Sequence, residues 1–332
     1  MKQRETKLSS TGWNNVRTIL VPTDFSSRTD NALTYALDLA RQFGAEVHLL
    51  HVIGPLEGEA YSPLRYTPEA AVLHHDPQKN IYDLLETTLA RHDAEGVEVE
   101  LVKQRGMKPA TAILDYARRE HIDLMVIGTH GAHGVRRLWL GSVAEEIVHQ
   151  APCNVLVVHE RDTAEATPRT IKRVLTPIDF SPPSRMLIQY AQALAASYNA
   201  AIDLLHVIET PSFLKPITGL ATLGDLAPDV GAKAESYLAH LRDEAATASV
   251  SIQAHLDEGQ PAARIVHHAR IHHTDLIVMA TRGLSGMKRF FLGSVTERVV
   301  RAAPCPVLCV KLDGPATSDM TAHAAPEAEE TE

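Results

Sequence analysis

Short runs of apolar, mostly β-branched residues alternate along the chain with longer runs in which apolar residues recur at helical spacing. In the first part of the sequence this pattern predicts strands at 17–22, 46–53, 97–103, 123–128 and 154–159, and helices at 27–43, 77–95, 109–120 and 142–150. Continuously apolar strands separated by helices are typical of a parallel sheet covered on both faces. We therefore expect an α/β fold with right-handed crossovers.

The same order of motifs occurs twice. VRTILVPTDFSS (16–27) matches KRVLTPIDFSPP (172–183), AEVHLLHVI (45–53) matches AAIDLLHVI (200–208), and IDLMVIGTHG (122–131) matches TDLIVMATRG (274–283). LGSVAEEIVHQAPCNVLVV (140–158) likewise matches LGSVTERVVRAAPCPVLCV (292–310). Each copy is long enough to hold its own core, which indicates a duplicated domain.

The repeat predicts two domains, at 15–160 and 168–313, joined by the polar stretch 159–170. We expect weakly ordered tails at 1–14 and 314–332, and loops at 54–76 and 209–230 that serve as lids or interaction surfaces. In the second copy, Ser181 followed by Pro182 predicts a helix N-cap with proline in the first helical position.

Glycines gather after the fourth apolar run of each copy, in GTHGAHGVRRLWLGS (128–142) and ATRGLSGMKRFFLGS (280–294). A parallel strand that ends here delivers the chain to the carboxyl edge of the sheet, where open α/β sheets bind ligands. Glycine lets a backbone approach a ligand closely, and the helix that Ser142 opens offers unpaired N–H groups to an anion. The loop suits a phosphate chain, although glycines also shape ordinary turns and Ser142 is also a plausible N-cap.

Asp24 follows the first strand and has two interpretations. Its carboxylate can accept hydrogen bonds from hydroxyl or amino groups of a ligand, or it can form an Asx turn or a helix cap. The neighbouring Thr23 is replaced by Ile178 in the second copy, so that position does not require a hydroxyl in both domains.

Charge and cysteine content narrow the classes of partner. The formal net charge is −9, but the tail 314–332 holds five acidic residues and no Lys or Arg, so the remainder is only mildly acidic and suggests no broad basic face for nucleic acid. Three cysteines, all in apolar surroundings, indicate buried thiols in a reducing compartment. No apolar stretch is long enough to span a membrane, and no signal sequence is evident, so we expect a cytoplasmic protein.

The spacing G-x2-G-x9-G-[ST], formed by Gly128, Gly131, Gly141 and Ser142, resembles the nucleotide motif of the universal stress protein family. The VPTDFS, LLHV and APCxVLVV segments extend this resemblance over both halves. It implies two tandem copies of a five-stranded parallel sheet of order 3-2-1-4-5, with helices on both faces, in the adenine-nucleotide alpha-hydrolase-like architecture. It also implies pairing of the two halves through the last strands, 154–160 and 306–312, as an intrachain pseudo-dimer, and leaves a further homodimer open.

The resemblance implies ATP, or another adenine nucleotide, as the ligand, with Mg²⁺ as a candidate companion. The adenosine side of the first domain would comprise Pro22, Thr23, Asp24, Val52 and Ile127, and its phosphate side Gly128, Gly131, Gly141, Ser142, Val143 and Ala144. The matching positions of the second domain are Asp179, Val207, Ala280, Gly283, Gly293, Ser294, Val295 and Thr296. Arg136, Arg137, Lys288 and Arg289 either neutralise phosphate oxygens or form a solvated basic turn.

Ala280 is the one departure from the glycine pattern in the second domain. If this position has an ordinary φ, alanine is harmless; if φ is positive, the strain is about 1 kcal/mol. Strain of that size would weaken binding by about tenfold or less. We therefore expect nucleotide in the first domain and weaker binding in the second.

The sequence gives little support for catalysis or for metal binding. The sequence contains no GxxxxGK[ST], no GxGxxG after the first strand and no GxSxG, and no general base is evident near the glycine loop. We assign no catalytic residue and expect at most slow ATP hydrolysis. Histidines gather in two places, at His74, His75 and Asp76 and at His267, His268, His272 and His273. Neither group shows the three or four converging ligands that a firm metal site needs, so no metal site is assigned.

Three hypotheses follow from the sequence. The first is a cytoplasmic ATP-binding stress sensor or regulator. The second is a nucleotide-free interaction scaffold of the same fold, and the third is a weak ATP hydrolase.

Overall fold

The computed structural model describes residues 16–54, 81–129, 140–159, 170–209, 228–281 and 292–311. In the first half the strands are β1 (Thr18–Pro22), β2 (Glu46–Ile53), β3 (Val99–Arg105), β4 (Leu124–Gly128) and β5 (Asn154–Val158). In the second half they are β6 (Arg173–Ile178), β7 (Ala201–Glu209), β8 (Ile252–Gly259), β9 (Leu276–Ala280) and β10 (Val307–Val310).

The described helices follow the same repeat. They are α1 (Ser27–Phe43), α3 (Ile81–Leu89), α4 (Pro109–Arg119) and α5 (Ser142–Gln150), then α6 (Pro183–Tyr198), α8 (Pro228–Ala245), α9 (Pro261–Ile271) and α10 (Ser294–Ala302). Apart from the end of α3, the strands and helices predicted in the first half are confirmed to within two residues wherever they fall on described residues.

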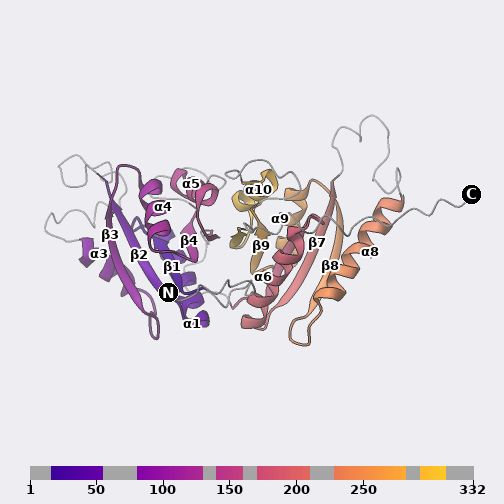
Figure 1. Cartoon of the computed structure of the whole chain (residues 1–332), viewed down its shortest axis with the longest axis horizontal. Coiled ribbons are helices and arrows are strands. Elements are labelled where there is room, and N and C mark those ends of the chain that lie inside the picture. The colour runs from indigo at the N-terminus through magenta and orange to yellow at the C-terminus, as the bar shows by residue number, and fades with distance from the viewer. Residues whose placement is uncertain are drawn as a thin grey trace, which may run out of the picture.

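The ten strands of the described residues form one sheet of order β3-β2-β1-β4-β5-β10-β9-β6-β7-β8. Figure 1 shows the outermost strands, β3 and β8, towards opposite ends of the molecule. Each half therefore has the order 3-2-1-4-5, and the second half runs back across the sheet from the shared centre. Strands within a half are parallel, whereas β5 and β10 are antiparallel, with Leu156 opposite Leu308. The predicted fold class is confirmed.

Alternating strand residues divide the core into two clusters, one on each face of the sheet. One cluster includes the buried faces of α1, α3, α6 and α8, and the other those of α4, α5, α9 and α10. Both clusters contain residues from both halves, so the hydrophobic core is continuous across the β5–β10 junction. Burial of apolar surface stabilises the folded state by about 25 cal/mol for each Å² removed from water.

Polar contacts supplement the core at the junction. The Tyr198 hydroxyl of α6 donates to Asp38 of α1 at 2.7 Å, and the Lys311 ammonium donates to the carbonyl of Ala151 at 3.0 Å. On the opposite face Arg301 of α10 lies 3.2 Å from Glu145 of α5. These contacts fix the rotation of one half against the other.

Three boundaries differ from the sequence-based expectation. The helix expected to reach residue 95 ends at Leu89, because Asp93 accepts a hydrogen bond from the Glu95 N–H in a turn and Gly96 then has φ 75°. α6 begins at Pro183 rather than after a Ser181 cap, because the Ser181 hydroxyl bonds Asp179 instead. Residues 228–230, expected in a loop, open α8.

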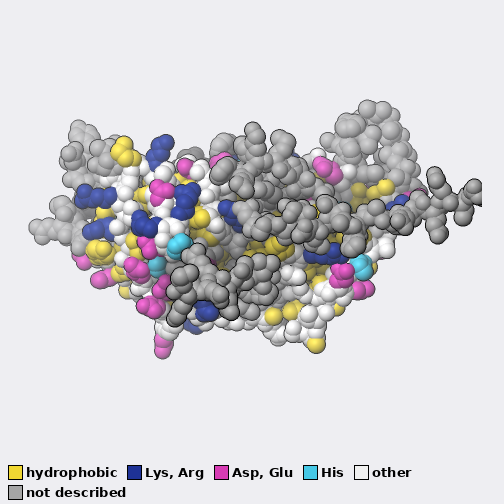
Figure 2. Space-filling view, viewed as in Figure 1, with side chains coloured by type: hydrophobic (Ala, Val, Ile, Leu, Met, Phe, Trp, Pro, Cys, Tyr) yellow, Lys and Arg dark blue, Asp and Glu magenta, His cyan; other side chains and the backbone are white. Residues whose placement is uncertain are grey.

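Two of the three cysteines are buried. Cys305 and Cys309 are buried and Cys153 is half-buried, and burial raises the pKa of Cys309 to about 12. Among described residues, acidic and basic side chains are interspersed over the first half on the face seen in Figure 2. No helix of the described residues is long and apolar enough to cross a membrane.

The tails, the linker residues 160–169 and most of both long loops fall outside the described residues. The same is true of Gly131, Gly283, the arginines and lysine between the glycines, and the group at 74–76.

Candidate functional site

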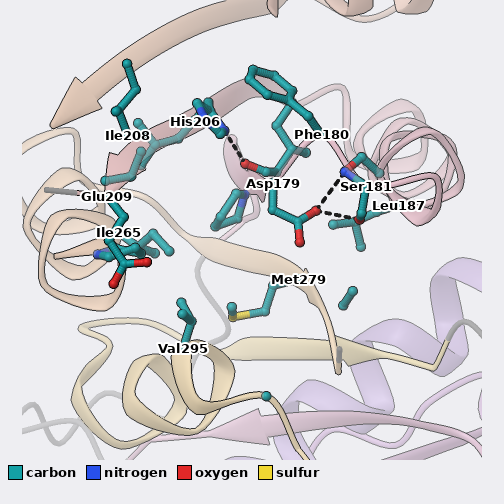
Figure 3. Close-up of a pocket in the computed structure, with 18 of the residues that line it drawn as sticks. Asp179, Phe180, Ser181, Leu187, His206, Ile208, Glu209, Ile265, Met279 and Val295 are labelled. Atoms are coloured by element: carbon teal, nitrogen blue, oxygen red, sulfur yellow. Dashed lines mark hydrogen bonds between the residues drawn. The ribbon is translucent and has the colours of Figure 1, made fainter. Parts of the chain in front are cut away.

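A cavity of about 730 Å³ lies in the second half, at the carboxyl ends of β6, β7 and β9 (Figure 3). The starts of α6, α9 and α10 and one face of α8 complete its wall. β6 and β9 are neighbours at the point where the strand order reverses, which is where open α/β sheets bind ligands. The cavity is lined by the predicted residues Asp179, Val207, Ala280, Gly293, Ser294, Val295 and Thr296.

Asp179 forms a turn and lies on the cavity wall. One of its carboxylate oxygens accepts hydrogen bonds from the Ser181 N–H at 3.1 Å and from the Ser184 hydroxyl at 3.2 Å. Asp24 forms the same turn in the first half, accepting from the Ser26 N–H at 3.1 Å. The Asx-turn interpretation is therefore correct for both aspartates. Figure 3 shows the Asp179 carboxylate projecting into the cavity from this turn.

The phenylalanine after each aspartate has a left-handed backbone. Phe25 has φ 63° and Phe180 has φ 60°, a conformation in which L residues are strained by about 1 kcal/mol or more. The strained turn places the Phe180 ring against His206, with ring centroids 3.8 Å apart. Tyr237 of α8 meets the other side of Phe180 edge-on, at 4.9 Å. Aromatic rings thus form one wall of the cavity.

His206 is held in one tautomer. Its Nδ1 lies 2.9 Å from the Ile178 carbonyl, and because a carbonyl only accepts, Nδ1 carries the proton. Burial lowers the pKa of His206 below its ordinary value, partly offset by the same hydrogen bond and by Asp179. His51 makes the corresponding bond to the Thr23 carbonyl at 2.9 Å. In both histidines, therefore, Nδ1 carries the proton and donates to the carbonyl that ends the turn's preceding segment.

The start of α10 presents backbone donors to the cavity. Gly293 is the N-cap, and the first helical hydrogen bond runs from the Glu297 N–H to the Gly293 carbonyl at 2.9 Å. The N–H groups of Ser294, Val295 and Thr296 therefore have no acceptor within the helix. In the first half Gly141 caps α5 in the same way, with the Glu145 N–H 2.8 Å from its carbonyl.

Each glycine loop is closed at its ends. The Gly293 N–H donates to the Thr281 carbonyl at 2.8 Å, and the Gly141 N–H donates to the Thr129 carbonyl at 2.6 Å. These bonds bring the end of the fourth strand of each half next to the start of its last helix. Each of the two glycines therefore lies between the end of the fourth strand and the start of the last helix of its half.

Ala280 does not have the positive φ that would strain an alanine backbone. It ends β9 in extended conformation, paired with Val310, just as Gly128 ends β4 paired with Val158. Extended backbone accommodates alanine as readily as glycine. The methyl group is part of the cavity wall, and the Thr296 hydroxyl donates to the Ala280 carbonyl at 2.9 Å.

The first half places its predicted residues at the equivalent strand ends. Pro22 ends β1, Val52 lies near the end of β2, and Ile127 precedes Gly128 at the end of β4. The Thr23 hydroxyl is buried within the turn, where it accepts from the Phe25 N–H at 3.0 Å and contacts Thr29. The Thr23 side chain thus serves the turn in the first half, and the second half, which has Ile178 here, forms the same turn without that hydroxyl.

Some residues that line the cavity were not predicted from the sequence. Lys233 and Tyr237 come from α8, and Lys233 is the single Lys or Arg among the described residues that line the cavity. Glu209, at the end of β7, adds a second carboxylate to that of Asp179. No motif marks α8, because its approach to the strand ends is decided by tertiary packing.

Several known proteins are similar to this chain. A universal stress protein of Mycolicibacterium smegmatis is 28% identical over 309 residues, covering 88% of this chain and 96% of the relative. The crystal structure of a universal stress protein from Archaeoglobus fulgidus has a TM-score of 0.59 at 20% identity, covering 91% of this chain and 98% of that one. A universal stress protein crystallised with cAMP covers 43% of this chain and 96% of its own, at 24% identity and a TM-score of 0.32.

The sequence model of the universal stress protein family matches residues 15–159 and again residues 170–311. The two matches coincide with the two halves of the sheet and leave the tails and most of the linker outside. The chain therefore belongs to the universal stress protein family and contains two copies of its domain.

Proposed function

We propose that this protein binds ATP, or a closely related adenine nucleotide, and acts as a cytoplasmic stress sensor or regulator whose occupancy shifts its loops or assembly. The cavity at the β6–β9 switch point is the observation that carries the proposal. It has about 730 Å³ of space and receives the unpaired N–H groups at the start of α10. Small-molecule sites usually have volumes of about 300–1,000 Å³.

The charges in the cavity favour one orientation of the nucleotide. The start of α10 attracts anions through its N–H groups and the helix dipole, so the phosphates would lie against Gly293, Ser294 and Val295. A carboxylate repels phosphate but accepts hydrogen bonds from hydroxyl and amino groups. Asp179 would therefore face the ribose or adenine, with the apolar wall that includes Val207 beside the base.

The full proposed site has two copies. In the second half it comprises Asp179, Val207, Ala280, Gly283, Gly293, Ser294, Val295 and Thr296. In the first half it comprises Pro22, Thr23, Asp24, Val52, Ile127, Gly128, Gly131, Gly141, Ser142, Val143 and Ala144. Thr23 would act through its backbone, because its hydroxyl is engaged in the turn. Mg²⁺, where it accompanies ATP, would be held by the phosphates.

We also assign the domains to 15–160 and 168–313. The antiparallel β5–β10 pair is then an intrachain pseudo-dimer contact through 154–160 and 306–312, and it occupies an apolar edge that an isolated domain would expose. A homodimer of the whole chain would have to use another surface.

The proposal is tested by extracting the denatured full-length protein for nucleotide and by titrating nucleotide-free protein with ATP and with GTP in a calorimeter. We expect ATP in the extract or a saturable heat with ATP, and weaker binding of GTP. Absence of both at millimolar ATP with magnesium would support the nucleotide-free scaffold instead. Phosphate release that is lost in Gly141→Ala combined with Gly293→Ala would support slow hydrolysis.

A further inference from the structure

A second polar cluster lies in the second half, outside the cavity. It consists of Asp203 on β7, His255 on β8 and His268 on α9, and one potential ligand atom from each lies within 4.8 Å of the other two. None of the three lines the cavity. Asp203 lies one strand repeat before Leu205, which does line it, so the cluster is on the α9 face towards the start of β7.

The distances are close to those of a metal site. Asp203 Oδ1 lies 3.3 Å from His255 Nε2, and Asp203 Oδ2 lies 3.8 Å from His268 Nε2. Tetrahedral zinc has metal–nitrogen and metal–oxygen distances of about 2.0–2.2 Å, which separate neighbouring ligand atoms by about 3.4 Å. Small side-chain movements would therefore bring the three atoms onto one ion.

His268 supplies the strongest indication of a missing ligand. Its side chain is only 6% exposed, and its Nε2 is buried without a hydrogen-bond partner. The 3.8 Å separation from Asp203 is too long for a hydrogen bond. A buried polar atom without a partner costs free energy, and the carboxylate that Nε2 faces is itself only 1% exposed.

Arg173 and His272 hold the side chains of the cluster in place. The Arg173 guanidinium donates to Asp203 Oδ2 at 3.0 Å, which orients the carboxylate and leaves Oδ1 directed to His255. Carboxylate ligands of metals are commonly held in this way by a hydrogen bond to the second oxygen. The His272 ring stacks on His268 with centroids 4.1 Å apart and fixes the plane of that imidazole.

The first half provides an internal comparison. Strand and helix register place His48, Val102 and Tyr116 at the positions of Asp203, His255 and His268. Valine has no ligand atom, and the Tyr116 hydroxyl hydrogen-bonds His48 at 2.7 Å. Among the described residues, two histidines and a carboxylate converge in this way in the second half and not at the matching positions of the first, so the cluster is not needed to build the fold.

We propose that Asp203, His255 and His268 bind one divalent transition-metal ion, with zinc the ion that the two imidazoles and one carboxylate suit best, and with a solvent molecule as the fourth ligand. The site is independent of nucleotide binding. It would tie β7, β8 and α9 together at the far edge of the sheet.

The test uses the full-length, nucleotide-free protein after treatment with a chelator. Zinc affinity and stoichiometry are measured by competition with a chromophoric chelator, and cobalt(II) is added separately to read coordination geometry from its visible absorption. His255→Ala and His268→Ala are compared with His267→Ala, an exposed histidine next to His268 on the same helix. Far-ultraviolet circular dichroism monitors folding of each variant.

We expect one zinc per chain, a tetrahedral cobalt spectrum, and a loss of affinity of at least about tenfold in His255→Ala and His268→Ala but not in His267→Ala. His255 is on a strand at the sheet edge and its side chain is 27% exposed, so its variant should fold even if His268→Ala does not. No zinc binding by the wild type, or equal affinity in the wild type and His255→Ala, would overturn the proposal.

Discussion

At the scale of single residues, the aspartate–phenylalanine–serine turn decides how the cavity is shaped. Asp179 holds the turn with one carboxylate oxygen, and the left-handed Phe180 swings its ring onto His206. The same geometry occurs at Asp24 and Phe25. A strained non-glycine residue that recurs in both halves is consistent with a site that requires the aromatic ring in this place.

Ala280→Gly tests whether the methyl group contacts the ligand. Because Ala280 is extended, glycine relieves no strain there and should lower stability by about 0.5–1 kcal/mol. If the methyl restricts the nucleotide, ATP affinity of the second site should rise by up to about tenfold, as read by calorimetry. The reciprocal Gly128→Ala should weaken the first site. Unchanged ATP affinities in both variants would show that the methyl group at this position does not affect nucleotide binding.

His206 predicts a pH dependence of stability. Its pKa in the folded protein is lowered by burial from 6.5, the value that the unfolded chain keeps. As pH falls through 6.5 the unfolded chain takes up the proton first, so folded stability declines until the lower folded pKa is reached. In urea titrations, His206→Asn should reduce this decline, although it also loses the contact with Phe180. An identical pH profile in the variant would contradict the assignment.

At the scale of elements, the first turn of α10 is the feature on which phosphate binding depends. Ser294 occupies the first helical position, and Gly293 before it has ψ 142°, the extended conformation that a following proline prefers. Ser294→Pro should therefore keep the helix while removing one N–H and the hydroxyl. Ser294→Ala removes the hydroxyl alone.

We expect Ser294→Pro to weaken ATP binding at the second site by about tenfold or more, because a hydrogen bond to a charged group contributes about 1.5–3 kcal/mol. Ser294→Ala should have a smaller effect, since the backbone donor remains. Calorimetric titration of both variants measures the difference. Equal loss in the two would show that the hydroxyl, and not the main chain, holds the ligand.

The elements themselves were predictable because their apolar runs are unambiguous. The end of α3 was not, because it is set by a turn at Asp93 and by the positive φ of Gly96. The strand-end residues of the site followed from motif spacing, whereas Lys233 and Tyr237 reach the cavity only through the packing of α8. Asp203 and His255 were missed for a similar reason: they are far apart in sequence and converge only when β7 and β8 pair.

At the scale of the whole molecule, we expect the β5–β10 pair to make the chain unfold as one cooperative unit. Leu308 is fully buried opposite Leu156, within a core cluster that both halves share. Leu308→Ala should lower the free energy of unfolding by about 2–5 kcal/mol. In scanning calorimetry we expect one unfolding peak, shifted down in this variant and unshifted in Met107→Ala, an exposed residue. Two separate peaks, only one of which moves, would mean that the halves unfold independently.

The most direct measurement is the number of ATP molecules bound per chain in calorimetric titrations of the wild type, Ser142→Pro, Ser294→Pro and the double variant. Both serines occupy the first helical position after a glycine cap, so the substitutions are matched. The account predicts two ATP sites of unweakened affinity in the wild type, one in each single variant and none in the double variant. Undiminished binding in the double variant, or no binding by the wild type at millimolar ATP with magnesium, would contradict it.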